Sequence, residues 1–435
     1  MRWMDDYNAK RTTAAAAVAG IEAGQRVYLG AGCAVPHSLV DALVDREELR
    51  DVHVYHILTV GTARYAEAEM ADRFRCIALF VGPNVRQAVN DGRVDYMPIH
   101  LHQVPDLFRS DDHRPDVAFV QVSPPDEHGF CSFGIEVGVT RPAARSARRI
   151  VAEINRCMPR TLGDSFIHVS KLDACVEVDR PLDIFPRAEM SEVQRCIGRN
   201  VATLVQDGAC LQLGIGGIAE AVLGHLDDKK DLGIHTEMFS DGLLELMDKG
   251  VITGERKTFH PGKVVAGFVL GSQDLYDYVH DNAIIELHPT DYVNNPIHIA
   301  SNERMTAING ALQVDLTGQV CADSIGTEIY SGFGGQVDFM RGAAMSEGGV
   351  AITALRSTAC NGTISRIVPT LDTGAGVVTT RADVHYVVTE HGVARMIGRT
   401  LRERAKELIE IADPRFREDL LKAAHQRTHF APFPS

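Results

Sequence analysis

The chain has few aromatic side chains: Phe, Trp and Tyr make up 6% of its 435 residues, with a single tryptophan, Trp3. Its 38 glycines and its alanine-rich runs favour close packing of helices on strands rather than a β-sandwich filled with aromatic rings. Hydrophobic residues (45%) and charged residues (23%) are near the average for globular proteins, so the chain can form a large core. The length favours two or three domains.

A surplus of positive charge is also missing, since the formal net charge is −14. Proteins that bind nucleic acids or anionic membranes through bulk charge need a basic face. We therefore expect neither a nucleic acid nor a membrane as a partner. An anionic ligand remains compatible with this charge, because the backbone N–H groups at the start of a helix can hold a phosphate locally.

The cysteine pattern does not indicate a framework of disulfides or of zinc ligands. The nine cysteines are an odd number and include no Cys-x-x-Cys pair, which indicates reduced thiols. The apolar run 14–21 is too short for a membrane span or the core of a signal peptide, so a cytoplasmic location is expected. The pair His100/His102 lacks a suitably spaced third ligand. Glu127 and His128 can reach a neighbouring cleft, but one histidine beside two acids is weak evidence for a metal. We expect no metal and no tightly bound cofactor.

Several catalytic motifs are absent. There is no Gly-x-Ser-x-Gly elbow and no Walker A loop, which disfavours a serine hydrolase of the α/β type and a nucleotide hydrolase. The segment GIGGIAEAVL (214–223) has glycines after an apolar stretch but does not complete the G-x-G-x-x-G dinucleotide fingerprint.

The chain repeats itself. Residues 18–32 and 202–216 align without gaps, and their glycines coincide. Each segment predicts a helix end, a glycine stop, a short apolar strand, a Gly-x-Gly turn and a second helix. Residues 51–57 also resemble 231–237, and 88–92 resemble 278–282.

This pattern predicts two similar, open, mostly parallel α/β domains, because short apolar strands alternate with helices. We place the domains at 1–185 and 186–435. The stretch 401–425 is amphipathic around Pro414 and predicts a C-terminal helical segment, followed by a loose tail at 431–435. Ligands of such sheets bind at the carboxyl ends of the strands.

Three segments of the second half are candidates for the site. The loop 214–218 follows a predicted strand and can bring backbone N–H groups to a phosphate or thioester, or it can be a purely structural turn. Glu237 stands at a predicted strand end, where it can face a ligand or cap the following helix. The glycine loop in 331–343, which ends with Asp338 and Arg341, can enclose an extended ligand or form a turn and helix cap.

Six segments together resemble the acetyl-CoA hydrolase/transferase family over essentially the whole chain. They are SPPDEHGFCSFG (123–134), NRCMPRTLGDSFIH (155–168), GIGGIAEAVL, LGIHTEMFSDG (232–242), GFGGQVDFMRGA (332–343) and SRIVPTL with VTTRADVHYVVTEHGVA (365–394). The resemblance implies that Glu237 is a covalent nucleophile. It also implies that coenzyme A contacts Gly214, Ile215, Gly216, Gly217, Ile218 and Leu312, and that Gly335 donates its N–H to the thioester oxyanion.

The activity that the resemblance implies is CoA transfer. CoA would move between an acetyl, butyryl or 4-hydroxybutyryl thioester and a free carboxylate such as acetate, through a glutamyl-CoA thioester with ping-pong kinetics. An acyl-CoA hydrolase that uses the same glutamate and a non-catalytic acyl-CoA-binding protein are the alternatives. Arg356, His391 and Phe333 depart from the residues expected in the family and bear on the shape of the acyl pocket. A homodimer or higher homo-oligomer is expected only from the general preference for closed symmetry.

Overall fold

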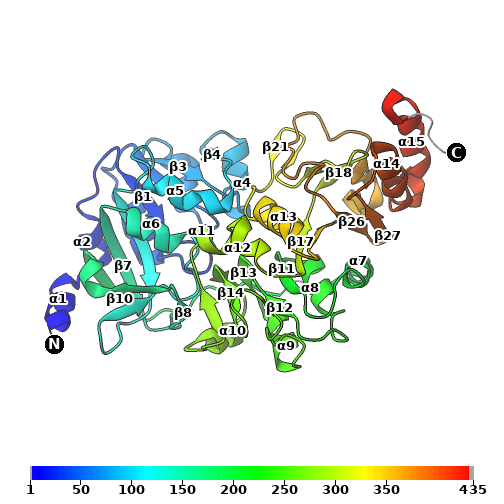
Figure 1. The fold of residues 1–435 in the computed structure, drawn as a ribbon. Helices are drawn as coiled ribbons and strands as arrows, with labels where there is room; N and C mark the ends of the chain where they lie inside the picture. The colour runs from blue at the N-terminus through cyan, green and yellow to red at the C-terminus, as the bar shows by residue number, and fades with distance from the viewer. Residues whose placement is uncertain (1, 188, 431–435) are drawn as a thin grey trace. The chain divides into compact units, whose positions relative to one another are not determined.

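The computed structural model describes residues 2–187 and 189–430, which form two compact units (Figure 1). The first unit comprises the chain up to Pro186 together with Glu237–Phe239 and Val265–Val293. The second comprises Arg187–Thr236, Ser240–Val264 and the chain from Asn294 onward. The first unit thus includes two segments from the second half of the sequence, and Glu237 is one of their residues. The domain boundary at residue 185 stays a prediction.

A seven-stranded parallel sheet forms the centre of the first unit. Its order is β10 (Ala174–Val178), β7 (Arg149–Asn155), β5 (Val117–Val122), β1 (Arg26–Leu29), β2 (Val52–His56), β3 (Phe74–Ala78) and β4 (Val94–Tyr96). All six residues of β5 are buried, so helices and loops cover both faces of the sheet. The strand order runs in opposite directions from β1 and β5, which makes their carboxyl ends the topological switch point.

Within the described residues up to Pro186, six α-helices accompany this sheet, and the first two of them precede β1 in the sequence. They are α1 (Arg2–Lys10), α2 (Ala14–Val18), α3 (His37–Val44), α4 (Pro83–Asn90), α5 (Val104–Arg109) and α6 (Thr140–Ser146). Figure 1 shows α5 and α6 together in front of the sheet, and α6 contacts both α5 and β5. In α5 and α6 the apolar side chains pack inward, and arginines occupy their last turns.

Smaller sheets complete the first unit. The sheet β13 (Met238–Phe239) with β15 (Phe268–Val269) is parallel, and β6 (Phe130–Ser132) pairs with β9 (Phe166–His168) in antiparallel fashion. A third sheet has the order β14 (Val264–Ala266), β16 (Ile285–Leu287), β8 (Leu162–Gly163). The helices α10 (Gln273–Val279) and α11 (Thr290–Val293) flank β16 in the sequence.

The second unit has a six-stranded sheet of the same design. Its order is β12 (Gly233–Ile234), β11 (Cys210–Leu213), β17 (Met305–Gly310), β22 (Val350–Ala354), β26 (Tyr386–Thr389) and β27 (Gly392–Arg395), with only the last pair antiparallel. The switch point lies between β11 and β17. The helices of this unit are α7 (Glu192–Ala202), α8 (Gly217–Leu223), α9 (Asp241–Asp248), α12 (Pro296–Ala300) and α13 (Gln336–Met345). Both α7 and α13 contact β22.

Short strands and a helical pair finish the second unit. The strands are β18 (Gln313–Asp315), β19 (Val320–Cys321), β20 (Ser324–Ile325), β21 (Glu328–Ile329), β23 (Thr358–Ala359), β24 (Ile364–Ser365) and β25 (Ile367–Val368). The predicted C-terminal helices are confirmed as α14 (Leu401–Glu410) and α15 (Pro414–His425). A capping box of Thr400 and Glu403 begins α14, and the Asp413 cap with Pro414 begins α15. The predicted tail at 431–435 lies outside the described residues.

The repeat seen in the sequence is a structural repeat. The strands β1 and β11 occupy aligned positions, and the glycine stops before them, Gly24 and Gly208, have φ of +76° and +72°. A residue with a Cβ is strained at such φ values, which explains the glycines. The predicted α/β class with mostly parallel sheets is confirmed. Within the described residues, no helix combines the length and the apolar character that crossing a membrane requires.

Candidate active site

Glu237 lies in the first unit, immediately before β13, and is half-buried. Its backbone carbonyl accepts hydrogen bonds from the N–H groups of Gly267 (2.9 Å) and Phe268 (3.0 Å). The next residues continue this attachment, because β13 pairs with β15 and Leu270 N–H donates to Phe239 O at 3.1 Å. The backbone of the glutamate is therefore fixed by the neighbouring strand.

Two glycines allow the chain to approach Glu237 closely. Gly138 N–H donates to Gly267 O at 2.9 Å, and an added Cβ on Gly267 would lie 3.1 Å from Glu237 O. Val269 N–H donates to Ile135 O at 2.8 Å, so the segment after SPPDEHGFCSFG packs along β15. This segment therefore supports the strand to which Glu237 is attached, a role that sequence reasoning missed.

Glu136 is the buried carboxylate of that segment, with 4% of its surface exposed. Its carboxylate accepts hydrogen bonds from Val139 N–H at 3.1 Å and Thr140 N–H at 3.2 Å, at the start of α6. Burial raises the pKa of Glu136 to about 7, although these hydrogen bonds oppose the rise. The sequence did indicate that Glu136 is a special residue, because a single acid inside the apolar run FGIEVGV is unusual. Acidic side chains are seldom fully buried unless they have partners.

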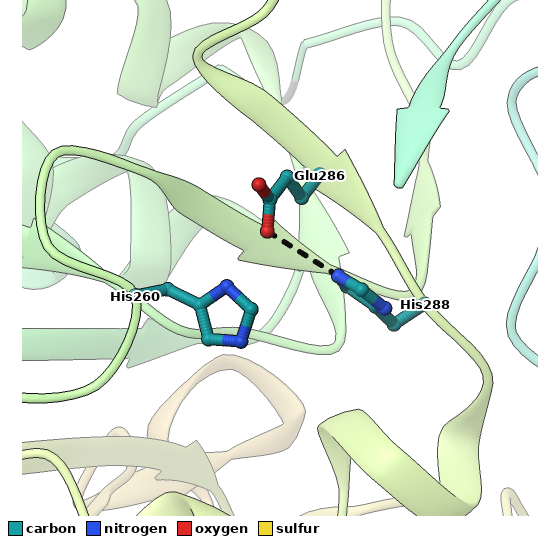
Figure 2. Close-up of side chains that lie close together, drawn as sticks. All are labelled: His260, Glu286 and His288. Atoms are coloured by element: carbon teal, nitrogen blue, oxygen red, sulfur yellow. Dashed lines mark hydrogen bonds and ion pairs between the residues drawn. The ribbon is translucent and has the colours of Figure 1, made fainter. Parts of the chain in front are cut away.

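The other polar pairs singled out in the first unit lie elsewhere in it. The rings of His100 and His102 stack with centroids 6.0 Å apart, and His128 Nε2 lies 3.4 Å from Glu127 Oε1 on the surface. Figure 2 shows a further pair that sequence reasoning did not select: His288 Nε2 lies 3.4 Å from Glu286 Oε2. His260, also drawn there, belongs to the second unit.

In the second unit, only residues 214–216 of the predicted loop 214–218 connect β11 to α8, at the switch point of the sheet. Gly217 and Ile218 are instead the first residues of α8, and Gly217 is buried. Gly216 has φ of +104°, a conformation that glycine adopts readily. An added Cβ on Gly214 or Gly216 would meet nothing within 4 Å, and Ile215 is 49% exposed. The loop is therefore open to a ligand on the side of these residues.

Leu312 follows β17, which is the parallel neighbour of β11. The residues after β11 and Leu312 thus lie at the same edge of the second sheet, which is the edge where open parallel sheets bind ligands. Beneath the edge, the buried amides of Gln212 and Asn309 bond to each other, at 3.3 and 3.1 Å. Sequence reasoning missed this pair, although an amide in each of two apolar strands was a visible signal.

Gly335 is the N-cap residue of α13 and is buried. Of the two charged residues predicted beside it, Asp338 is buried in α13, whereas Arg341 Nε lies 3.4 Å from Asp383 Oδ1. Two of the unusual residues are also in this unit at strand ends. Arg356 donates to Ser191 Oγ at 3.4 Å after β22, and His391 Nε2 lies 3.8 Å from Glu390 Oε1 after β26. Phe333 is half-buried in the glycine loop before α13.

Comparison with known proteins agrees with the resemblance seen in the sequence. The family models for the acetyl-CoA hydrolase/transferase N-terminal and C-terminal domains match residues 1–186 and 271–424. A 4-hydroxybutyrate coenzyme A transferase from Clostridium kluyveri is 50% identical over 98% of this chain and 100% of its own length.

Solved structures agree in both sequence and fold. The crystal structure of RipA from Yersinia pestis has a TM-score of 0.92 at 39% identity and covers 98% of this chain and 99% of its own. A 4-hydroxybutyrate CoA-transferase from Porphyromonas gingivalis has a TM-score of 0.85 at 43% identity, covering 98% of this chain and 100% of its own. Two family models and relatives that match along almost their full length lead to one conclusion: the chain belongs to the acetyl-CoA hydrolase/transferase family.

Proposed function

We propose that this protein is a CoA-transferase that moves CoA between a short-chain acyl-CoA and a free carboxylate. Acetyl-CoA, butyryl-CoA and 4-hydroxybutyryl-CoA are the proposed thioesters, and acetate is the proposed acceptor. The observation that carries the proposal is the half-buried Glu237, whose backbone carbonyl accepts two hydrogen bonds. The chain around it is 50% identical to a 4-hydroxybutyrate coenzyme A transferase. A cytoplasmic location and a homodimer or higher homo-oligomer remain predictions.

Glu237 is the proposed nucleophile because a carboxylate in its ordinary ionised form needs no separate base. Its oxygen attacks the thioester carbonyl carbon, the C–S bond breaks, and a mixed anhydride and CoA thiolate result. The thiolate then attacks the glutamyl carbonyl, expelling the first carboxylate and leaving a glutamyl-CoA thioester. The acceptor carboxylate reverses these two steps, so no proton or electron is gained or lost overall.

The second unit supplies the proposed contacts to coenzyme A. The open residues 214–216, the start of α8 at Gly217 and Ile218, and Leu312 bind the CoA moiety, and Gly335 N–H donates to the oxyanion of each tetrahedral intermediate. One such donor is typically worth about 2.7–4 kcal/mol in the transition state. Binding energy from the CoA moiety, which is remote from the reacting carbon, can also lower the barrier. Water has to be excluded, because it would hydrolyse the anhydride.

Trapping the covalent intermediate tests the proposal directly. The protein is mixed with acetyl-CoA in the absence of an acceptor, treated with sodium borohydride and digested for mass spectrometry. A glutamyl-CoA thioester is reduced to the alcohol, so we expect this mass change on the peptide that contains Glu237. The Glu237→Gln variant should show no change there, whereas the exposed-site control Glu255→Gln should behave like the wild type. An unmodified Glu237 in protein that binds CoA would contradict the covalent mechanism.

An acyl-CoA hydrolase is the second candidate, because the family description includes hydrolases. The two activities differ in the fate of CoA. With butyryl-CoA and acetate, a transferase forms acetyl-CoA without releasing a free thiol, and its ping-pong kinetics give parallel initial-velocity lines. A hydrolase releases free CoA at a rate that acetate does not change.

A further inference from the structure

The first unit contains a cavity of about 700 Å³, and its lining includes neither Glu237 nor any residue proposed above to contact coenzyme A. Helices α5, α6 and α11 line it, together with the turn after β8. The side chains that matter here are Arg109, Arg141, Arg145, Asp164, His288 and Tyr292. A cavity of this volume is in the size range of sites for small organic ligands.

Positive charge is in excess on the wall of this cavity. Arg109 Nη2 lies 2.6 Å from Asp291 Oδ2, and Arg141 pairs with Asp164. Arg145 is exposed and has no ion-pair partner within the described part of the chain. Among the residues that line the cavity, three guanidinium groups stand against two carboxylates, and Asp106, which does not line it, also pairs with Arg109 at 2.5 Å. Arg145 is therefore the guanidinium that carries the unpaired charge. An anion that enters the cavity can pair with Arg145 without displacing an existing partner.

Arg141 provides a second, independent indication of a ligand. Its side chain is 14% exposed, and its Nε is a buried donor without a hydrogen-bond partner among the described residues. Burial lowers the pKa of this guanidinium. An added acceptor would satisfy the donor and offset the cost of burying the charge. Arg141 and Arg145 are four residues apart on α6, so they lie on the same face of the helix.

The remaining wall contains two rings, His288 and Tyr292, beside Pro142, Ser146 and Pro289. The rings of His288 and Tyr292 stack, with centroids 4.7 Å apart and planes at 27°. Stacked rings present a flat surface on which a planar base can pack. Guanidinium groups match phosphate oxygens with paired, charge-assisted hydrogen bonds.

We propose that this arginine-lined cavity binds an organic diphosphate of nucleotide size. The chemistry has two sources: the adenosine diphosphate portion of coenzyme A, or a free nucleotide that acts as an effector. The binding itself does not depend on the proposed transferase activity, because it is measured without turnover.

Isothermal titration calorimetry of the full chain with ADP and with pyrophosphate tests the site. We expect both to bind, and Arg145→Gln to weaken ADP binding by about tenfold or more, as expected for the loss of one charge-assisted contact. Arg148→Gln is the matched control: it removes the same charge three residues away, and Arg148 is exposed and does not line the cavity. Arg145 has no ion pair to lose, so its replacement should leave the melting temperature unchanged.

Three results would overturn the proposal: no binding of ADP, equal loss of affinity in both variants, or binding of succinate alone. Kinetics then identify the source of the diphosphate. If Arg145→Gln raises the KM for acyl-CoA and leaves kcat unchanged, the ligand is the substrate's own ADP portion. If the variant loses ADP affinity but keeps the KM for acyl-CoA, the ligand is a separate nucleotide. Both results support the site, and a protein without any transferase activity could still be titrated.

Discussion

The two units use the same switch-point loop in opposite ways. In the first unit, neighbouring segments of the chain pack against the loop that contains Gly30 and Gly32. Gly30 N–H donates to Phe119 O at 2.9 Å, and Ala31 is 3% exposed. In the second unit, nothing lies within 4 Å of an added Cβ on Gly214, and the residue aligned with Ala31, Ile215, is 49% exposed. One loop is closed and the other is open.

This difference suggests that the first unit mainly supports the backbone of Glu237, whereas the second unit mainly binds the substrate. The closed loop and the buried Glu136 belong to the first unit, which also holds the backbone of Glu237 through Gly267. The open loop belongs to the unit that we propose contacts coenzyme A. Changes in the first set should therefore appear mainly in the free energy of unfolding, and changes in the second set mainly in the KM for acyl-CoA.

The largest effect on stability is expected from the pH dependence that Glu136 contributes. Its pKa is about 7 in the folded protein against an ordinary value of 4.5, so the folded state binds the proton more tightly. Unfolding then releases this proton between pH 4.5 and about 7, and the stability that Glu136 contributes is full below this range and falls as the pH rises through it. The loss is on the order of 3 kcal/mol across the range.

The Glu136→Gln variant isolates this contribution, because glutamine cannot titrate but keeps one acceptor oxygen for the start of α6. Urea unfolding of both proteins at pH 5, 6, 7 and 8 gives the difference in stability. We expect the advantage of the wild type over the variant to shrink by about 3 kcal/mol from pH 5 to pH 8. A difference that stays constant with pH would show that Glu136 titrates normally.

The closed loop should tolerate a methyl group poorly. In Gly30→Ala, the new Cβ would lie 3.1 Å from Ala34 O, 3.3 Å from Pro36 Cδ and 3.4 Å from Phe119 O. Two of these neighbours are backbone carbonyls that cannot rotate away. We expect the free energy of unfolding to fall by about 1–3 kcal/mol, as for other overpacked sites. Unfolding in urea at pH 7 measures this loss, and an unchanged midpoint would mean that the loop yields easily.

The sequence predicted local structure well where the pattern was local. The repeat located β1 and β11, and the amphipathic pattern around Pro414 located α14 and α15. It did not predict that Glu237–Phe239 and Val265–Val293 would join the first unit, because strand pairs such as β13 with β15 are set by tertiary contacts.

The candidate site was predictable to the same degree. Glycines before a helix and an acid near a predicted strand end are local signals, and they selected the loop 214–218 and Glu237 as candidates. Glu237 lies immediately before β13 and not at the end of a strand. The support by Gly138 and Gly267 depends on a close approach of two segments far apart in the sequence. The arginine-lined cavity likewise needs Arg109 of α5 beside Arg141 and Arg145 of α6. The sequence shows that Arg141 and Arg145 are four residues apart, but it does not show that Arg109 lies beside them.

The open loop offers the smallest effect and the clearest contrast with Gly30. The φ of Gly214 is not in the left-handed region and an added Cβ would meet nothing, so Gly214→Ala should change the free energy of unfolding by no more than about 0.5 kcal/mol. If this loop contacts coenzyme A, the methyl group takes space from the ligand. We therefore expect the KM for acyl-CoA to rise by about tenfold, equal to about 1.4 kcal/mol, with kcat nearly unchanged.

Steady-state kinetics beside urea unfolding of both alanine variants, Gly30→Ala and Gly214→Ala, measures the two effects together. A variant that keeps both its stability and its KM would mean that the loop, although open, does not contact the substrate. The assignment of substrate binding to this loop of the second unit would then be wrong.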